Sequence, residues 1–285
     1  MQAVQRNIIR KMSGINAACV IIGDEVLNGK ITDTNSRFFA QYCYNLGINL
    51  REIATVGDSE EQIVSTIRRL TPENDFIITS GGIGPTHDDI TYESVGKSFN
   101  LPVAIDGECQ RRMHKISSPE SRLSEQALKD FYRMATLPKG ASVKNYYLVE
   151  DYWVPVVSIE NKVFVLPGIP QMFERLLNGL KPVIKQLYKL NPNHSEDFRR
   201  YFVKTKLSES EISQYLRDLQ SRANEVSPDI KIGSYPHFGQ GFNTVSILGI
   251  KKHEDLLREI TKQTVEQLKG EEISEEQEKA YSDNR

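Results

Sequence analysis

The chain has 285 residues, of which 39% are hydrophobic and 26% charged, and its 36 basic residues nearly balance its 38 acidic ones. This composition is typical of a globular protein of one large domain or two, and it excludes collagen-like, disordered and coiled-coil chains. The longest uninterrupted apolar run, Ala17 to Ile22, is far shorter than the roughly 20 residues of a membrane helix. We therefore expect no membrane partner, and the near-neutral charge indicates no nucleic-acid partner.

The cysteines and the N-terminal residues indicate a cellular compartment. Three cysteines at positions 19, 43 and 109 form no CxxC pair, which favours free thiols in a reducing compartment, and we expect the cytoplasm. Residues 1–14 are predicted to be a flexible N-terminus. Because residues 1–12 contain three basic side chains and no acid, a mitochondrial presequence is the alternative.

Residues 15–190 are predicted to form one α/β domain. Short apolar strands at 17–22, 50–56 and 76–79 alternate with helices at 33–47 and 59–71, which indicates right-handed crossovers. A helix up to Phe99, a polar helical stretch over 107–135, paired strands at 154–159 and 162–166, and a helix from Pro170 with a kink at Pro182 follow. The pattern predicts a three-layer, doubly wound, mostly parallel sheet.

A breaker-rich segment at 191–195 is the predicted domain boundary. Residues 195–269 then show the order strand, helix, two strands, helix, which predicts a smaller ferredoxin-like α+β domain. Six acidic side chains lie among residues 270–285, so this end is predicted to be a solvated acidic tail.

The first strand is followed by Gly23-Asp24-Glu25 and then by Asp33-Thr34-Asn35. In open α/β sheets this edge is where ligands bind. The alternative is that Asp24 and Glu25 are ordinary loop acids and that Asp33 only caps a helix.

The third strand is followed by SGGIGPTHDDIT, residues 80–91. Three glycines in four positions let the backbone approach a ligand closely, and their N–H groups, just before a helix, are able to bind a phosphate. The spacing differs from a dinucleotide fingerprint, and the P-loop lysine is absent. The residues predicted to bind phosphate are Ser80, Gly81, Gly82, Gly84 and Thr86, with Asn35.

Asp88 and Asp89 allow two interpretations. Thr86 and Asp89 have the spacing of a capping box, so both acids could serve only the helix N-terminus. Beside a phosphate site, however, two carboxylates would repel the substrate unless a divalent cation lay between them. His87 is more typical of a surface residue than of a base or metal ligand.

Taken in order, GDEVLNG, DTN, SGGIGPTHDDIT and LPGIP closely resemble the molybdopterin-binding (MoaB/Mog-like) superfamily. Within it they resemble most the branch of CinA N-terminal domains and of the N-terminal domain of eukaryotic FAD synthase, and GSYP at 233–236 strengthens the eukaryotic match. The resemblance covers about residues 15–250. It implies a metal-dependent pyrophosphatase that cleaves a dinucleotide. The substrate would be FAD, which gives FMN and AMP, or ADP-ribose in the CinA-like members.

The resemblance also implies roles for residues. The metal ligands would be Asp24, Asp88 and Asp89, holding Co, Mn or Mg, with a monovalent cation such as K⁺ as a further candidate. Asp33 or Glu25 would accept a proton from the attacking water, so the predicted catalytic set is Asp33, Glu25, Asp88 and Asp89. We expect a small dinucleotide substrate and a homo-oligomer. Because the second domain that makes FAD in FAD synthase is absent from this sequence, FAD synthesis is not expected. The alternatives are adenylylation of molybdopterin and a non-catalytic flavin or nucleotide sensor.

Overall fold

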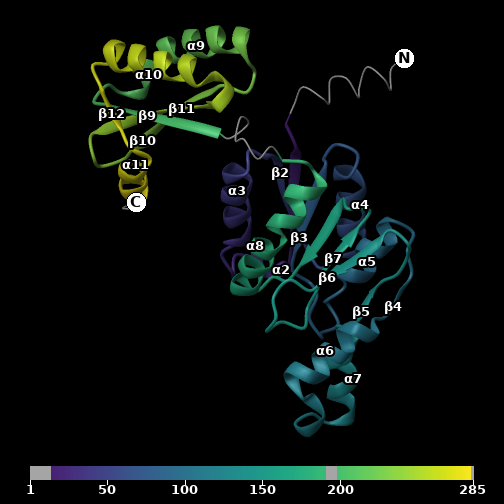
Figure 1. Cartoon of the computed structure of the whole chain (residues 1–285). Helices are drawn as coiled ribbons and strands as arrows, with labels where there is room; N and C mark the ends of the chain where they lie inside the picture. The colour runs from purple at the N-terminus through teal and green to yellow at the C-terminus, as the bar shows by residue number, and fades with distance from the viewer. Residues whose placement is uncertain (1–13, 191–197, 284–285) are drawn as a thin grey trace, which may run out of the picture. The chain divides into compact units, whose positions relative to one another are not determined.

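A computed structural model describes residues 14–190 and 198–283 (Figure 1). The chain divides into two compact units after Leu190. The predicted flexible N-terminus, apart from residue 14, and the predicted boundary at 191–195 lie outside the described residues. Among the helices that are described, none is long and apolar enough to cross a membrane.

The first unit is built on a six-stranded sheet with the order β2-β1-β3-β8-β7-β6. The strands β2, β1, β3 and β8 run parallel to one another, whereas β7 runs antiparallel between β8 and β6. The mostly parallel sheet predicted from the sequence is therefore confirmed. The strand bounds are Asn16–Ile22 for β1, Asn49–Val56 for β2, Phe76–Ser80 for β3, Val143–Tyr146 for β6, Val156–Ile159 for β7 and Val163–Leu166 for β8.

Helices cover both faces of this sheet. Helices α3 and α8 contact each other, as do α4 and α5, and these pairs form the two outer layers (Figure 1). The polar stretch at 107–135 forms two helices, α6 and α7, next to a small sheet of β4 and β5. The bounds are Asp24–Leu27 for α2, Asn35–Asn45 for α3, Glu60–Leu70 for α4, Thr91–Ser98 for α5, Val103–Ile105 for β4, Gly107–Ser117 for α6, Glu125–Arg133 for α7, Thr136–Pro138 for β5 and Pro170–Leu187 for α8.

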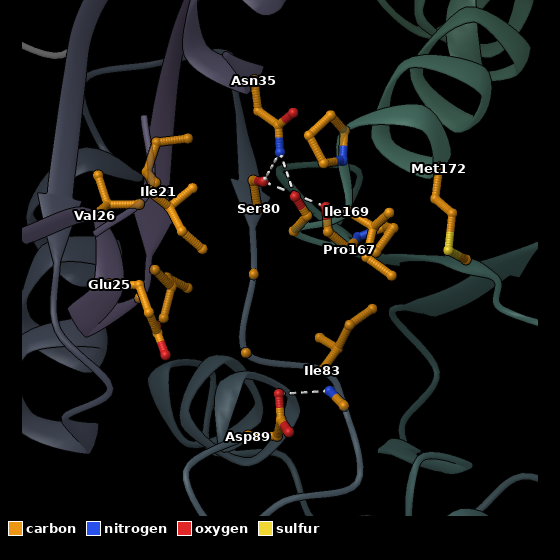
Figure 2. A pocket seen from close by; sticks show the side chains of 18 of the residues that line it. Ile21, Glu25, Val26, Asn35, Ser80, Ile83, Asp89, Pro167, Ile169 and Met172 are labelled. Carbon is orange, nitrogen blue, oxygen red and sulfur yellow. Dashed lines mark hydrogen bonds between the residues drawn. The ribbon is translucent and has the colours of Figure 1, made fainter. Parts of the chain in front are cut away.

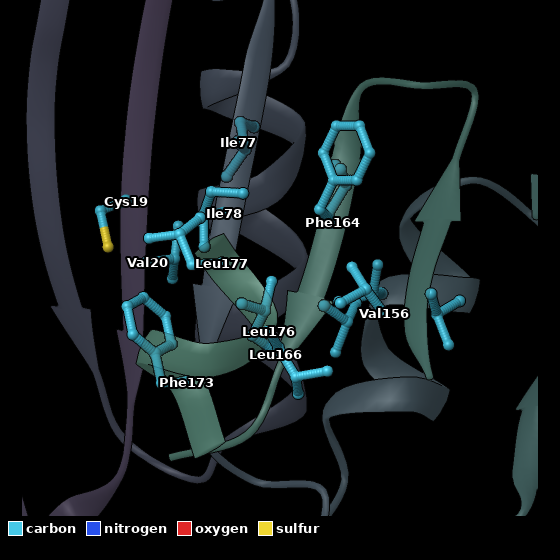
Figure 3. Packing of buried hydrophobic residues seen from close by; sticks show 14 of the residues in the cluster. Cys19, Val20, Ile77, Ile78, Val156, Phe164, Leu166, Phe173, Leu176 and Leu177 are labelled. Carbon is cyan, nitrogen blue, oxygen red and sulfur yellow. The ribbon is translucent and has the colours of Figure 1, made fainter. Parts of the chain in front are cut away.

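The core of the first unit lies between β1, β3 and β8 and the apolar side of α8 (Figure 3). Every residue of β1 is buried, because the sheet is covered on both faces, and Phe76 and Phe164 meet edge to face with ring centroids 6.2 Å apart. Phe173, Leu176 and Leu177 of α8 pack against these strands. This packing fixes the ends of the parallel strands, where the predicted site residues lie.

The second unit is a four-stranded antiparallel sheet with the order β10-β11-β9-β12. Its strands are β9 (Phe198–Thr205), β10 (Lys231–His237), β11 (Phe242–Ile250) and β12 (Glu271–Ile273), and its helices include α9 (Glu209–Val226) and α10 (Glu254–Gln267). The buried residues of both helices form one cluster with Val203, Val245 and Ile247 of the central strands. The second, smaller antiparallel domain expected from the sequence is present, with the β-α-β-β-α-β order of ferredoxin-like domains.

The prediction of a solvated acidic tail is wrong. Residues Glu271–Ile273 form β12, which pairs with β9 as the fourth strand, and Ile273 is buried. Gly270 allows this close approach, because a Cβ atom there would lie 2.4 Å from the carbonyl oxygen of Lys204. The acidic side chains Glu271 and Glu272 point to solvent. The sequence of this strand therefore lacks the apolar pattern from which a strand is predicted.

Helix α11, Glu275–Asp283, also packs on the second unit. Its Glu278 is buried and lies 3.3 Å from Nε2 of His237. The ring of Tyr281 packs edge-on against Phe242 at 5.0 Å, and Nζ of Lys204 lies over both of these rings. A few specific contacts thus dock a mostly charged helix.

Candidate active site

A pocket of about 550 Å³ lies at the carboxyl ends of β1, β3 and β8 (Figure 2). Its lining includes the turn after each of these strands, at Gly23, Gly81 and Gly168. Ligands of open parallel sheets bind at this edge, because the loops after neighbouring strands meet there. The sequence motifs at 23–35, 80–91 and 166–170 therefore contribute to one site.

The turn after β3 requires glycine at two positions. Gly81 and Gly82 have φ angles of +112° and +65°. A Cβ atom at Gly81 would lie 2.1 Å from the carbonyl oxygen of Ile22, and one at Gly82 would lie 2.3 Å from Oγ1 of Thr91. Thr91 fixes the turn, since its Oγ1 donates to the Gly81 carbonyl at 2.8 Å and its N–H donates to the Gly82 carbonyl at 2.9 Å. The backbone of the turn is therefore rigid before any ligand binds.

Several N–H groups of the predicted phosphate loop are already used within the protein. The N–H of Gly81 donates to Leu166, and those of Gly84 and Thr86 donate to the Asp89 carboxylate at 2.6 and 2.9 Å. In the part of the chain that the structure describes, the N–H groups of Gly82 and Ile83 have no acceptor, and both residues line the pocket. The amides free to bind an anion are thus fewer than the sequence motif suggests.

Asp89 organises this loop. Its Oδ1 accepts from Gly84, and its Oδ2 accepts from both the N–H and the hydroxyl of Thr86. Asp89 lines the pocket, whereas Thr86 and Asp88 are exposed and do not. Asp89 thus makes the contact to Thr86 that a capping box predicts, but α5 begins only at Thr91 and has no side-chain cap, so Asp89 holds the loop and does not cap the helix. Asp88 is the acid of this pair that faces solvent.

Arg133, the last residue of α7, holds the same loop from the other side. Its guanidinium donates to the carbonyl oxygens of Thr86 and Asp89, the latter at 3.2 Å, and lies 3.6 Å from Glu93. A hydrogen bond from the Thr86 side chain lowers the pKa of the exposed Asp88, and the charge of Arg133 lowers that pKa further. No sequence pattern indicated this role, because Arg133 lies more than forty residues from the loop that it contacts.

Asp33 and Asn35 both line the pocket, but they make different contacts. Oδ1 of Asp33 accepts from the N–H groups of Asn35 at 2.9 Å and Ser36 at 3.1 Å, as a capping residue does. The buried amide of Asn35 donates to Oγ of Ser80 at 2.9 Å and to the Gly168 carbonyl at 2.8 Å (Figure 2). Asn35 and Ser80 thus connect the turns after β3 and β8.

A group of carboxylates lies near Glu25 on the polar side of the site. Asp24 and Asp58 bind each other's backbone reciprocally, at 2.9 Å from the Asp24 N–H and 3.3 Å from the Asp58 N–H. Burial raises the pKa of Asp58, and the charges of Asp24, Glu25 and Asp88 raise that pKa further. The four side chains are therefore close enough for their charges to interact.

Asp58 lies among these carboxylates, outside the pocket lining, and the sequence interpretation did not include it. The available signal was its position directly after the second parallel strand, at the same edge as the other motifs.

The structure does not gather the predicted metal ligands Asp24, Asp88 and Asp89 into one set. Within residues 14–190 and 198–283, no group of three or more Asp, Glu, His or Cys side chains is arranged to hold a metal ion. The carboxylates around Asp58 nevertheless suit a hard cation, because a positive charge would relieve their mutual repulsion. Cations such as Mg²⁺ are commonly held by one or two carboxylates together with phosphate oxygens of the substrate.

The wall of the pocket away from these acids is apolar. Met134, Trp153, Ile169 and Met172 line it, with the side chain of Ile83. Figure 2 shows Ile83, Ile169 and Met172 across the pocket from Glu25. The LPGIP sequence thus contributes to the lining and is more than a rigid turn, and a Cβ atom at its Gly168 would lie 3.2 Å from Cα of Gly81.

Comparison with known proteins identifies the family. A profile described as "Probable molybdopterin binding domain" matches residues 18–186, which include all of the pocket. The chain belongs to this molybdopterin-binding domain family. Its similarity to CinA-like and FAD synthase-like proteins places it in that branch, as the sequence predicted.

Three molybdopterin-binding domain relatives show the range of the family. The chain is 33% identical over 239 residues to a protein named "Probable FAD synthase" from Caenorhabditis briggsae, covering 79% of this chain and 44% of that one. It is 30% identical over 243 residues to a "CinA-like protein" from Syntrophobacter fumaroxidans, covering 84% and 54%. The crystal structure of the protein CinA from Thermoplasma acidophilum superposes with a TM-score of 0.52 at 27% identity, over 59% of this chain and 98% of that one. The chain spans about half the length of the curated relatives it matches.

Proposed function

We propose that this chain is a metal-dependent pyrophosphatase that hydrolyses FAD to FMN and AMP. In this reaction water attacks one phosphorus atom of the phosphoanhydride, the bridging P–O bond breaks, and the water oxygen remains in one of the two products. The observation that carries the proposal is one pocket in which two free backbone amides lie between acidic side chains and an apolar wall. A dinucleotide has matching parts, since its charged phosphates are joined to aromatic rings.

The N–H groups of Gly82 and Ile83 would bind a phosphate oxygen on a turn whose shape is already fixed. One or two of the carboxylates among Asp24, Asp58 and Asp88 would hold a divalent cation such as Co²⁺, Mn²⁺ or Mg²⁺ together with phosphate oxygens of the substrate. When bound, that cation would offset the phosphate charge and polarise a phosphoryl oxygen.

Glu25 and Asp33 are the candidates for the general base. Both line the pocket, and Asp33 keeps Oδ2 outside the capping interaction of its Oδ1. Asp89 is assigned to holding the loop, because both of its oxygens accept hydrogen bonds from that loop. This assignment removes Asp89 from the catalytic set predicted from the sequence and leaves Asp33, Glu25 and Asp88.

The proposal is tested by incubating the purified chain with FAD and Mn²⁺, Co²⁺ or Mg²⁺ and separating the products by chromatography. We expect FMN and AMP in equal amounts, with a chelator stopping the reaction. Asp88→Asn should remove most of the turnover, whereas Asp218→Asn, an exposed aspartate on α9 in the second unit, should not change it.

A protein that is folded and loaded with each metal but leaves FAD intact would contradict hydrolysis. Molybdopterin adenylylation is the second candidate, favoured by the family match. It would appear as adenylylated molybdopterin formed from ATP and molybdopterin by protein that does not cleave FAD.

A further inference from the structure

The geometry points to the flavin half of FAD, and not the adenine half, as the occupant of the apolar wall, with the indole of Trp153 stacked on the isoalloxazine ring. This inference rests on the proposed function and adds to it which end of the dinucleotide the pocket selects. Trp153 has no part in the sequence motifs, lying in the loop before β7.

The first step of the argument is the distribution of polar groups around the pocket. The polar side chains of the lining come mainly from 25–35, Ser80 and Asp89, whereas the wall of Met134, Trp153, Ile169 and Met172 has a single polar side-chain group, the indole N–H of Trp153. Adenine carries nitrogen atoms on every edge, and burying them against such a wall without partners costs free energy. An isoalloxazine ring has an apolar dimethylbenzene edge that suits thioether and aliphatic side chains.

The second step is the position of Ile83. Its N–H is one of the two free amides, and its side chain belongs to the apolar wall. A phosphate bound at this amide therefore lies next to the wall, so the ring on that wall is the one nearest the bound phosphate. The pocket of about 550 Å³ has the volume of a typical ligand pocket, for which a fused ring and one phosphate are suitable occupants.

The third step is the support of Trp153. Its ring packs against Phe131 with the centroids 6.1 Å apart at 62°, and its carbonyl oxygen accepts from Sγ of the buried Cys109 at 3.9 Å. A side chain held in this way loses little further freedom when a ring stacks on it. Met134 and Met172 line the same pocket, and thioether sulfur atoms make favourable contacts with aromatic edges.

The test uses the fact that Trp153 is the single tryptophan of the chain. The metal-free protein is titrated with FMN and separately with AMP while tryptophan emission is recorded, and N-acetyltryptophanamide corrects for light absorbed by the flavin. We expect saturable quenching by FMN and none by AMP at the same concentrations. The emission of the bound flavin should also be quenched, because the two rings are in contact.

Variants then test the role of the ring itself, with FMN binding followed by equilibrium dialysis and the absorbance of the flavin. Trp153→Leu should raise the Kd for FMN by about 5- to 150-fold, the range expected for loss of one stacking contact, and Trp153→Phe should recover part of it. Phe238→Ala, at a fully exposed aromatic residue in the second unit, should bind FMN as the unchanged protein does.

Quenching by AMP but not FMN, or an equal Kd for FMN in Trp153→Leu and unchanged protein, would overturn this inference. Failure of the proposed function looks different. FMN that binds on Trp153 while FAD stays intact with every metal would contradict hydrolysis and support the ring site. FAD cleavage together with a Kd for FMN that does not depend on Trp153 would support hydrolysis and contradict the ring site.

Discussion

Asp88 and Asp89 are adjacent in the sequence but have opposite surroundings. Asp89 accepts three hydrogen bonds within its own loop, whereas Asp88 is exposed. Asp89→Asn should therefore lower the free energy of unfolding by about 1.5–3 kcal/mol, the value of a hydrogen bond to a charged group, and activity should fall with it. Asp88→Asn should keep the melting temperature and lose turnover. Thermal melts and FAD assays on both variants check this, and equal melting losses would contradict the separation of roles.

Asp58 gives a prediction about pH. Burial and then the charges of Asp24, Glu25 and Asp88 raise its pKa, so ionised Asp58 opposes folding of the metal-free protein. The penalty is fully present above the raised pKa and disappears as the pH falls through that value towards about 3.9, the ordinary value for Asp. Asp58→Asn should thus melt at a higher temperature than the unchanged protein at pH 7, with the difference shrinking at acidic pH.

The change in melting temperature of Asp58→Asn when metal is added provides the control. Mn²⁺ should raise the melting temperature of the unchanged protein, in the presence of AMP, more than that of Asp58→Asn. Asp218→Asn should follow the unchanged protein in both measurements. A lower melting temperature for metal-free Asp58→Asn at pH 7 would show that the carboxylate stabilises the apo fold.

At the scale of elements, α7 supports the phosphate loop through Arg133. Lysine keeps the charge but cannot donate to the carbonyl oxygens of Thr86 and Asp89 with the same planar geometry. Arg133→Lys should therefore lower kcat/KM for FAD by about 10-fold, or about 1.4 kcal/mol, with little change in the melting temperature. Arg111→Lys, an exposed residue of α6, is the matched control. An unchanged kcat/KM would mean that the loop keeps its shape without α7.

The C-terminal strand and helix give a second prediction for elements. Truncation after Gly270 removes β12 and α11, with the buried residues Ile273 and Glu278. The melting temperature of the second unit should fall by several degrees, and Tyr281→Ala, which loses contacts to Phe242 and Lys204, should cause part of that fall. Lys279→Ala, at an exposed position, should have no effect. Unchanged melting of the truncated chain would show that β12 and α11 are dispensable.

Elements with a strong apolar period could be predicted from the sequence, and those held by tertiary contacts could not. The stripe Ile63, Ile67 and Leu70 marks α4, and the continuous apolar run of β1 marks a strand buried on both faces. In contrast, β12 contributes one inward side chain, Ile273, after two acids that face solvent. Its stability comes from pairing with β9, which no local pattern encodes.

At the scale of the whole molecule, the sequence motifs predicted the polar residues of the site but not the residues of its apolar wall. The motifs from Gly23 to Asn35 and from Ser80 to Asp89 meet at one edge, because parallel strands end together. Trp153 and Met134 reach the pocket from segments with no motif, so only the folded chain brings them there. The sequence also could not reveal which amides and carboxylates of the loop are already bound to each other.

The central claim is that this pocket uses water to cleave a phosphoanhydride bond. The measurement that tests it most directly is FAD cleavage with Mn²⁺ in ¹⁸O-labelled water, followed by mass spectrometry of both products. We predict one ¹⁸O atom for each FAD cleaved, in the phosphate of either FMN or AMP but not both, and far less product from Asp88→Asn. Products without the label, or FAD that remains intact with every metal, would contradict the account.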